Sequence, residues 1–319
     1  MHGTIRGMFT SRPAAGLDDL RAAGDVLTRA WTAGAPRGGA LRGDLAWWYA
    51  QAWPTELGDR LRLWQADGET VAWSWFDGEE LEYATWCGDG RADEVIERSI
   101  LLFAVDDATT RASRGDGNGA VEAWAADDDH VARSLLAELG FERIPGTSAP
   151  GHHTRLSQFQ RTVGSDSPID GRPVPEGYRI RALACPGEIG IRVAAHRAAF
   201  APSKMRSEKC ERLLGLPDYR LEDDLVVEAP DGSIASFAIA WWDPIARVGE
   251  FEPVGTDPRH QRRGLSAALL CHGLRRYRQL GANLVQVFSD ADNAASEALY
   301  QSVGFSRRAF HDRFRRPGR

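Results

Sequence analysis

The spacing of hydrophobic positions predicts that the first half of the chain alternates between helices and short strands. Apolar residues three and four positions apart are typical of a helix that buries one face, and apolar residues at every second position are typical of a half-buried strand. The pairs Asp67-Gly68 and Asp77-Gly78 separate short alternating runs and predict tight turns in a three-stranded meander. The expected helices are residues 16–33, 93–112 and 127–139, and the expected strands are residues 61–65, 71–76, 81–86 and 121–124.

The second half of the chain has the same kind of pattern. Residues 162–177 are rich in Pro, Gly, Ser and Asp and are typical of a linker between the halves. Helices are expected at residues 187–200 and 207–214, from about residue 263 onward, and at residues 294–303. Strands are expected at residues 178–183, 225–228, 234–242, 248–254, 283–289 and 305–314.

The two halves are related in sequence. Residues 121–141 align without a gap with residues 285–305 when the chain is shifted by 164 positions. The identical pairs in this alignment are Val121 and Val285, Asp128 and Asp292, Leu135 and Leu299, Gly140 and Gly304, and Phe141 and Phe305. Internal repetition over this length indicates two copies of one fold. The expected domains are residues 1–161 and 178–319, joined by the linker 162–177.

A polar turn and a basic cluster precede the helix expected after residue 263. Asp257 and Pro258 are typical of a turn that ends a strand, and Arg262, Arg263 and Gly264 follow them. A helix start leaves its first amide groups unpaired and carries the positive end of the helix dipole, so it binds phosphate readily. The same pattern is also typical of an ordinary basic loop before an amphipathic helix.

Two stretches resemble motifs of a known family. Residues 261–266, QRRGLS, resemble the Q/R-x-x-G-x-G/A signature with which the GNAT superfamily of N-acetyltransferases holds the pyrophosphate of acetyl-CoA, with Ser266 where Gly or Ala is usual. Residues 293–305 resemble a second block of the superfamily, N-x-x-A-x-x-L-Y-x-x-x-G-F. The resemblance covers most of both halves. It implies an α/β (α+β) fold of two tandem GNAT domains, each a mixed, mostly antiparallel central sheet flanked by helices.

The resemblance implies that acetyl-CoA is the co-substrate and that only the second copy binds it. In the alignment of the halves, Ile100 takes the place of Gly264 and Leu136 takes the place of Tyr300, so the first copy is expected to be degenerate. Asn293 would contact the pantetheine arm, although an N-cap role alone would also explain it. The expected acetyl-CoA contacts are Val254, Gly255, Thr256, Gln261, Arg262, Arg263, Gly264, Leu265, Ser266, Ala267 and Asn293.

Three residues are candidates for the proton transfers of the reaction. Attack on a thioester needs a neutral amine and a proton for the leaving thiolate. Tyr300 matches the family tyrosine that protonates the thiolate, and the alternative is a tyrosine packed in the core. Strand alternation puts Glu250 and Glu252 on one face. They are candidates for a general base and for holding a cation. The alternative is that both side chains face solvent. The resemblance to histone-acetylating relatives favours Glu250 as the base, with Glu252 as the second choice.

Acidic and aromatic residues near these glutamates indicate a cationic acceptor. Carboxylates attract an ammonium group, and a tryptophan ring can cover it. Trp241, Trp242 and Asp243 are therefore the expected acceptor contacts, with core packing of the tryptophans as the alternative. We expect an N-acetyltransferase that acts on the primary amine of a small molecule, by direct attack in a ternary complex between the two copies. The alternatives are a non-catalytic acetyl-CoA sensor or scaffold, or an acetyltransferase acting on an aminoglycoside-type antibiotic or a protein amine.

The tandem arrangement resembles that of mycothiol synthase, a tandem GNAT chain with a silent first copy. The last ten residues, FHDRFRRPGR, do not resemble the end of that enzyme. The resemblance therefore implies an architecture and does not identify the acceptor.

Composition argues against several other classes of protein. The net charge of −6 at pH 7 is unfavourable for general nucleic-acid binding. The four cysteines are scattered without a C-x-x-C pair and the histidines lack ligand-like spacing, so neither a disulfide framework nor a metal site is expected. Residues 1–12 lack the apolar core of a signal peptide, and the apolar run 100–105 is too short for a bilayer. We expect a cytoplasmic monomer or homodimer that contacts neither membranes nor nucleic acid.

Overall fold

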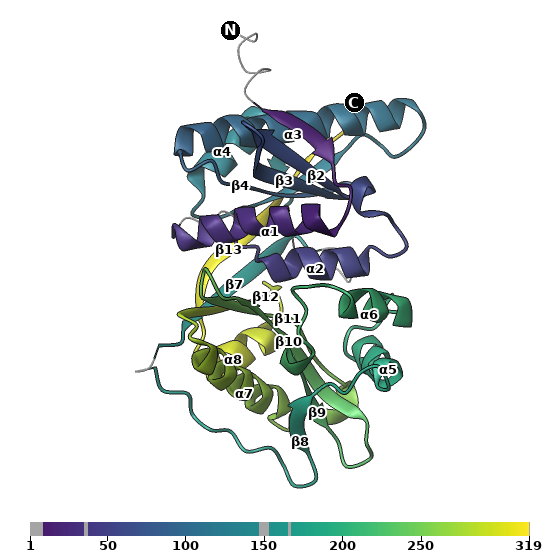
Figure 1. Ribbon diagram of the computed structural model, residues 1–319, viewed down its shortest axis with the longest axis vertical. Coiled ribbons are helices and arrows are strands. Elements are labelled where there is room, and N and C mark those ends of the chain that lie inside the picture. Colours follow the sequence, from purple (N-terminus) through teal and green to yellow (C-terminus); the bar gives the residue numbers. More distant parts are fainter. Residues whose placement is uncertain (1–8, 35–37, 147–152, 165–166, 319) are drawn as a thin grey trace.

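The strands of the chain form one continuous mixed sheet that is flanked by helices (Figure 1). The computed structural model describes residues 9–34, 38–146, 153–164 and 167–318. Residues 1–8, within the segment expected to lack a signal peptide, and residues 165–166 of the expected linker lie outside this description. The expected fold class is confirmed, because helices cover a mixed, mostly antiparallel sheet.

Helices of the first half bury the apolar faces that their spacing predicts. In α1, for example, Leu20, Leu27 and Trp31 are buried whereas Arg21 is exposed. The helices are α1 (Leu17–Thr32), α2 (Arg42–Gln51), α3 (Gly90–Ser113) and α4 (His130–Glu138). The strands are β1 (Thr10–Pro13), β2 (Leu61–Ala66), β3 (Glu69–Asp77), β4 (Glu80–Thr85), β5 (Val121–Ala126), β6 (Glu142–Arg143) and β7 (Arg155–Thr162).

The second half also follows its predicted order of elements. Its helices are α5 (Ile189–Ala199), α6 (Ser207–Leu214), α7 (Leu265–Leu280) and α8 (Ala294–Ser302). Its strands are β8 (Arg179–Ala182), β9 (Asp224–Glu228), β10 (Ile234–Asp243), β11 (Val248–Thr256), β12 (Leu284–Asp290) and β13 (Ser306–Arg316). None of the helices in the described part of the chain is long and apolar enough to cross a membrane.

Each half contains two parallel strands that pair at their first residues and then separate. In the second half, β11 and β12 pair only from Val248↔Leu284 to Glu250↔Gln286. In the first half, β4 and β5 pair only at Glu80↔Glu122 and Leu81↔Ala123. The backbone beyond these pairs is free of its parallel neighbour. A splay of this kind exposes strand amides and carbonyls to a ligand.

The final strands of the two halves are exchanged. The sheet has the order β1-β2-β3-β4-β5-β13-β7-β12-β11-β10-β9-β8, with β6 pairing to β13. Strand β13 at the end of the chain pairs with β5 of the first half, and β7 of the first half pairs with β12 of the second. Figure 1 shows β13, in yellow, running up into the first half beside β7. The exchange joins the two halves through backbone hydrogen bonds.

Side chains of α1 and α2 close the remaining boundary between the halves. Gly43 of α2 lies so close to the Trp241 ring that an added Cβ would come within 2.3 Å of it. Thr28 of α1 donates a hydrogen bond to the Asp243 carboxylate over 2.5 Å. One hydrophobic cluster accordingly contains Trp47 together with Trp241. The halves share a core, and Asp243 is used in holding them together.

Replacing Arg313 should destabilise the exchanged strand. Its guanidinium lies 2.7 Å from the buried Glu122 carboxylate and 3.0 Å from Glu80. Removing Arg313 leaves the buried Glu122 with Arg315 as its remaining partner, and the loss of one buried partner of this kind costs about 1–3 kcal/mol. Arg308 lies on the same strand but pairs with Asp128 at the surface, where such a pair contributes about 0–1 kcal/mol. Urea unfolding should show a large loss of stability for Arg313→Met and a small one for Arg308→Met, and equal losses would contradict this role.

Candidate active site

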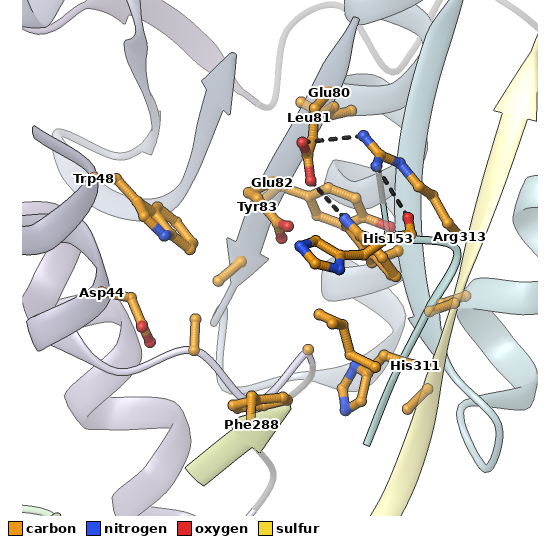
Figure 2. A pocket seen from close by; sticks show the side chains of 18 of the residues that line it. Asp44, Trp48, Glu80, Leu81, Glu82, Tyr83, His153, Phe288, His311 and Arg313 are labelled. Atoms are coloured by element: carbon orange, nitrogen blue, oxygen red, sulfur yellow. Dashed lines mark hydrogen bonds and ion pairs between the residues drawn. The ribbon is translucent and has the colours of Figure 1, made fainter. Parts of the chain in front are cut away.

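A cavity of about 510 Å³ lies where the two splays of the sheet face each other (Figure 2). It is bordered by β4, β5, β11, β12 and β13, and by α2. Its lining is strongly acidic, with one arginine, Arg313, two histidines, His153 and His311, and no lysine. The acidic residues that line it are Asp44, Glu80, Glu82, Glu97, Asp129, Glu250, Glu252 and Asp290. A negatively charged enclosure of this kind attracts cations.

Glu250 lies at the last paired position of β11, where the splay begins. Only 1% of the residue is exposed, and its Oε1 accepts a hydrogen bond from Gln286 Nε2 at 3.1 Å. No hydrogen bond from a described residue reaches its Oε2. Burial raises the pKa of Glu250 well above the usual value, and the neighbouring carboxyl of Asp44 raises it further. The site therefore contains a buried carboxyl with free hydrogen-bonding capacity.

Asp44 brings a first-half carboxyl to Glu250. It is the third residue of α2 and accepts a hydrogen bond from the Leu41 amide at 2.7 Å, which fixes its position. Burial raises the pKa of Asp44, while the Leu41 amide and the hydrogen bond with Glu250 oppose that effect. Because two adjacent buried carboxyls are costly to ionise together, the pair of Glu250 and Asp44 favours holding one proton between them.

Glu252 lies two residues further along β11 and faces the same cavity. Its backbone carbonyl accepts a hydrogen bond from Trp241 Nε1 at 2.6 Å. The ladder with β10 is irregular between Ala238 and Ala240, opposite this part of β11. Burial raises the pKa of Glu252 to about 8, with a further contribution from the charge of Asp44. The pKa is therefore placed near neutral pH, where a general base is most effective.

Tyr300 is buried on α8, on the other side of this strand, and does not line the cavity. Its ring packs against Phe159 and Phe305, with centroid separations of 5.5 Å and 6.1 Å. Burial raises the pKa of Tyr300, and the charge of Glu252 raises it further. The tyrosine and Glu252 are thus close enough to interact electrostatically, and the phenol stays protonated at neutral pH.

The three expected acceptor contacts lie outside the cavity lining. Trp241, on β10, is buried against α2, and its indole N–H donates a hydrogen bond to the backbone carbonyl of Glu252. Trp242 packs against Tyr277 at 6.2 Å on the opposite face of the sheet core. Asp243 accepts hydrogen bonds from Thr28 and from the amides of the following turn. Trp48 is the tryptophan that faces the cavity.

Sequence reasoning missed the first-half contributions to this cavity. Adjacent tryptophans such as Trp47 and Trp48 are more often core residues than ligand contacts, and here Trp47 is buried in the core whereas Trp48 also lines the cavity. Asp44 gave no signal, because it approaches Glu250 only through the packing of α2 on β10. Glu82 and Tyr83 lie on a strand that alternation predicts, but alternation does not tell which face meets the other copy.

The start of α7 has the features of a phosphate site. No side chain caps its first amide groups, and Gly264 before it has a φ of 74°. A Cβ added to Gly264 would meet no atom within 4 Å, so the approach to the helix is open. Arg262 and Arg263 are exposed beside it. Ser266 turns its hydroxyl to Thr256 on β11, 2.5 Å away, and so leaves the helix start clear.

The remaining expected acetyl-CoA contacts surround this helix start. Val254 and Gly255 lie on the part of β11 that has left β12, and Gly255 is packed closely against Phe237. Gln261 lies in the exposed loop, whereas Leu265 and Ala267 are buried in the first turn of α7. Asn293 caps α8 by accepting a hydrogen bond from the Ser296 amide at 3.1 Å. Its position is therefore explained by helix capping alone.

The matching helix of the first copy starts differently. Asp89 precedes α3 and caps it by accepting from the Arg91 amide at 3.0 Å, and Asp93 accepts from the Cys87 amide at 2.7 Å. Ile100, which the sequence alignment places opposite Gly264, is buried well inside α3. The shift of 164 positions does not hold before residue 121, because α3 has 24 residues and α7 has 16, and the loop after α3 is also longer. The start of α3 is therefore capped by the Asp89 carboxylate, unlike the start of α7.

No group of three or more His, Cys, Asp or Glu side chains that could hold a metal ion is found among the described residues.

The sequence is similar to that of known acetyltransferases. Residues 195–305 match the model of the Acetyltransferase (GNAT) family. Mycothiol acetyltransferase from Salinispora arenicola is 29% identical over 220 residues, which cover 66% of this chain and 67% of that protein. Mycothiol acetyltransferase from Geodermatophilus obscurus is 26% identical over 270 residues, which cover 79% of this chain and 80% of that protein.

Solved structures share the fold over nearly the whole chain. A GCN5-related N-acetyltransferase from Sphaerobacter thermophilus superposes with a TM-score of 0.63 at 17% identity, covering 98% of this chain and 97% of that one. A tandem GNAT protein from the clavulanic acid biosynthesis pathway superposes with a TM-score of 0.64 at 13% identity, covering 97% of this chain and 98% of that one. The expected tandem arrangement is confirmed. Residues 195–305 thus match the GNAT family of acetyltransferases, and the chain is similar in sequence to acetyltransferases and in fold to a tandem GNAT protein.

Proposed function

We propose that the chain transfers the acetyl group of acetyl-CoA to the primary amine of a small cationic molecule held in the acidic cavity. The observation that carries this proposal is the course of β11. Its first half brings Glu250 and Glu252 to the cavity, and its second half leaves β12 and leads to the uncapped start of α7. One strand therefore connects a site suited to an ammonium group with a site suited to a pyrophosphate.

The residues present fit acetyl-CoA. The first amides of α7, with Arg262 and Arg263, would hold the pyrophosphate by hydrogen bonds and charge. The backbone of residues 251–256, which β12 does not pair, would bind the pantetheine arm. When bound, acetyl-CoA supplies the activated thioester acyl group. The chain's own task is then to place a neutral amine beside it in a ternary complex and to control two protons.

Glu252 is the stronger candidate for the general base. The sequence resemblance favours Glu250, but Glu250 is held by Gln286 and shares a proton with Asp44. No described residue donates a hydrogen bond to the Glu252 carboxyl, and its pKa of about 8 lets it accept a proton from an ammonium group near neutral pH. Glu250 and Asp44 would then provide the negative charge that holds the amine in place.

Tyr300 would protonate the leaving thiolate. The raised pKa keeps its phenol protonated, and it lies near the base Glu252 on the side of α8. A phenol donates readily to a thiolate because the ordinary acidities of the two groups differ by only ~1.5 units. The base and the acid therefore lie close to each other around β11.

The size of the cavity favours a small acceptor. A volume of about 510 Å³ is within the range typical of small-molecule sites, ~300–1,000 Å³. The curated relatives are described as mycothiol acetyltransferases, and the same class of small amine acceptor is the natural starting point for this chain. A panel of small amines assayed for acetyl-CoA consumption would identify the acceptor.

Only one molecule of coenzyme A should bind per chain. The start of α7 is open and flanked by arginines, whereas the start of α3 is capped by the Asp89 carboxylate. Titration calorimetry should give a stoichiometry near one, and Arg262→Gln with Arg263→Gln should weaken binding by about tenfold or more. Arg91→Gln changes a residue at the start of α3 and should leave binding unchanged. Two comparable sites would contradict the degenerate first copy.

Tyr300→Phe should lower kcat by ~10²–10⁴-fold and change the KM for acetyl-CoA little, because it removes a proton donor needed mainly in the transition state. The phenylalanine ring keeps the packing against Phe159. Tyr219→Phe is the control, since it removes another buried hydroxyl, bonded to Asp224 at 2.9 Å, on a residue that does not line the cavity. A kcat for Tyr300→Phe within a factor of a few of wild type would make Tyr300 a packing residue.

The pH profile should distinguish the two glutamates. Because the base must be ionised, wild-type kcat/KM should rise with pH through the Glu252 pKa of about 8. Glu252→Gln should lower kcat/KM by ~10²-fold or more and remove this limb of the profile. Glu250→Gln should retain the limb. All variants are assayed with the same acceptor, so the titration of the acceptor's amine contributes equally to every pH profile. An unchanged profile in both variants would mean that the amine arrives already neutral.

A further inference from the structure

The first copy retains the pair of acidic positions that carries the proposed chemistry in the second. Glu250 faces Gln286 at the last pair of its parallel ladder, and Glu80 faces Glu122 at the corresponding ladder. Gln286 and Glu122 are equivalent in the sequence repeat. Glu80 therefore corresponds to Glu250, and Glu82 corresponds to Glu252. The first copy has lost the phosphate site and kept both carboxyls.

Within each pair, one carboxyl is held by hydrogen bonds and the other is not. Glu80 accepts from Trp124 Nε1 at 2.8 Å and from Arg313 at 3.0 Å, and Glu250 accepts from Gln286. The side chains of Glu82 and Glu252 make no hydrogen bond or ion pair with any described residue. Figure 2 shows Glu82 reaching into the cavity across from Asp44 and Trp48. Each copy thus presents one unpaired carboxyl to the same space.

The positive groups of the cavity do not compensate these carboxyls. Arg313 is occupied by Glu80 and Glu122. His153 lies 3.0 Å from Asp290, and burial lowers the pKa of His311 to about 4, so that ring is neutral. The fully buried Glu250 also has an oxygen that no described donor reaches. The carboxyls of Glu82 and Glu252 therefore have no cationic partner among the described residues, and a cationic ligand would supply one.

Two unpaired carboxyls in one cavity are best matched by a ligand with two positive charges. Glu82, Glu252 and Asp44 line the same cavity; burial raises the pKa of both glutamates, and the charge of Asp44 raises both further. A single ammonium beside Glu252 would leave Glu82 without a partner, at the cost of a buried unpaired carboxyl. Trp48 offers an aromatic face for the apolar chain between two charges. The volume of about 510 Å³ accommodates such a molecule.

We propose that the acceptor carries two ammonium groups, one placed at Glu252 for acetylation and the other held by Glu82 of the first copy. This inference rests on the proposed acetyl transfer in the same cavity. It gives the degenerate copy a role in recognition: β4 no longer serves a phosphate site, but its carboxyl binds the far end of the acceptor. The second ammonium is neither acetylated nor deprotonated. Its ion pair with Glu82 sets the distance between the charges and so selects among diamines.

The test compares diamines with monoamines of the same chain length. Diaminopropane, diaminobutane and diaminopentane are assayed against propylamine, butylamine and pentylamine for acetyl transfer. Wild type should show a kcat/KM at least about tenfold higher for the best diamine than for its monoamine. Glu82→Gln should remove that preference, because it should lower kcat/KM for the diamine far more than for the monoamine. Glu79→Gln is the matched control, because it removes the same charge just outside the cavity lining and should preserve the preference.

A charge-retaining variant and a binding assay complete the test. Glu82→Asp shortens the side chain and should move the best diamine towards a longer one. Calorimetry with the diamines should show binding to wild type that is weakened by about tenfold in Glu82→Gln. Equal turnover of monoamines and diamines by wild type, or an equal loss for both in Glu82→Gln, would overturn this inference while leaving amine acetylation intact. Glu82-dependent binding of diamines without acetylation of any amine would instead overturn the proposed function.

Discussion

The exchange of β7 and β13 is the contact on which the rest of the structure depends. Because β13 pairs with β5 and β7 pairs with β12, the two copies share one sheet and cannot turn independently. The buried pair of Arg313 and Glu122 holds β13 in place within the first copy. This connection sets the two splays face to face. A cavity between copies joined only by a flexible linker would lack a defined shape.

The shared cavity explains why so many carboxyls are kept at an energetic disadvantage. Asp44, Glu250 and Glu252 all have a raised pKa because burial removes water from them without supplying cations. Such a site is costly for the empty protein and favourable for a cationic ligand. A bound ammonium group, as proposed, would lower these pKa values again, and the ionised carboxylate is the form able to accept a proton.

The two copies differ at the helix start and resemble each other at the strand before it. At α7 the helix start is uncapped and open, which suits a phosphate; at α3 the Asp89 carboxylate caps the Arg91 amide, and Asp93 accepts from the Cys87 amide before the helix. The strand before each helix has changed much less, since both carry two glutamates at corresponding positions. If the proposed function holds, the first copy keeps a carboxyl-bearing strand for the acceptor without an open helix start for the cofactor.

The sequence by itself determined the repeat, most of the helices and strands, and the residues around the start of α7, because these depend on local periodicity and on short motifs. It also indicated Glu250, Glu252 and Tyr300 through their neighbours. Strand β7 escaped prediction because its buried positions include polar side chains, Ser157 and Gln158, rather than an apolar alternation. Only the tertiary structure placed Asp44 and Glu82 in the cavity and Trp241 in the core. Those positions depend on how two copies of one fold pack together, which is a matter of contacts between residues far apart in the chain.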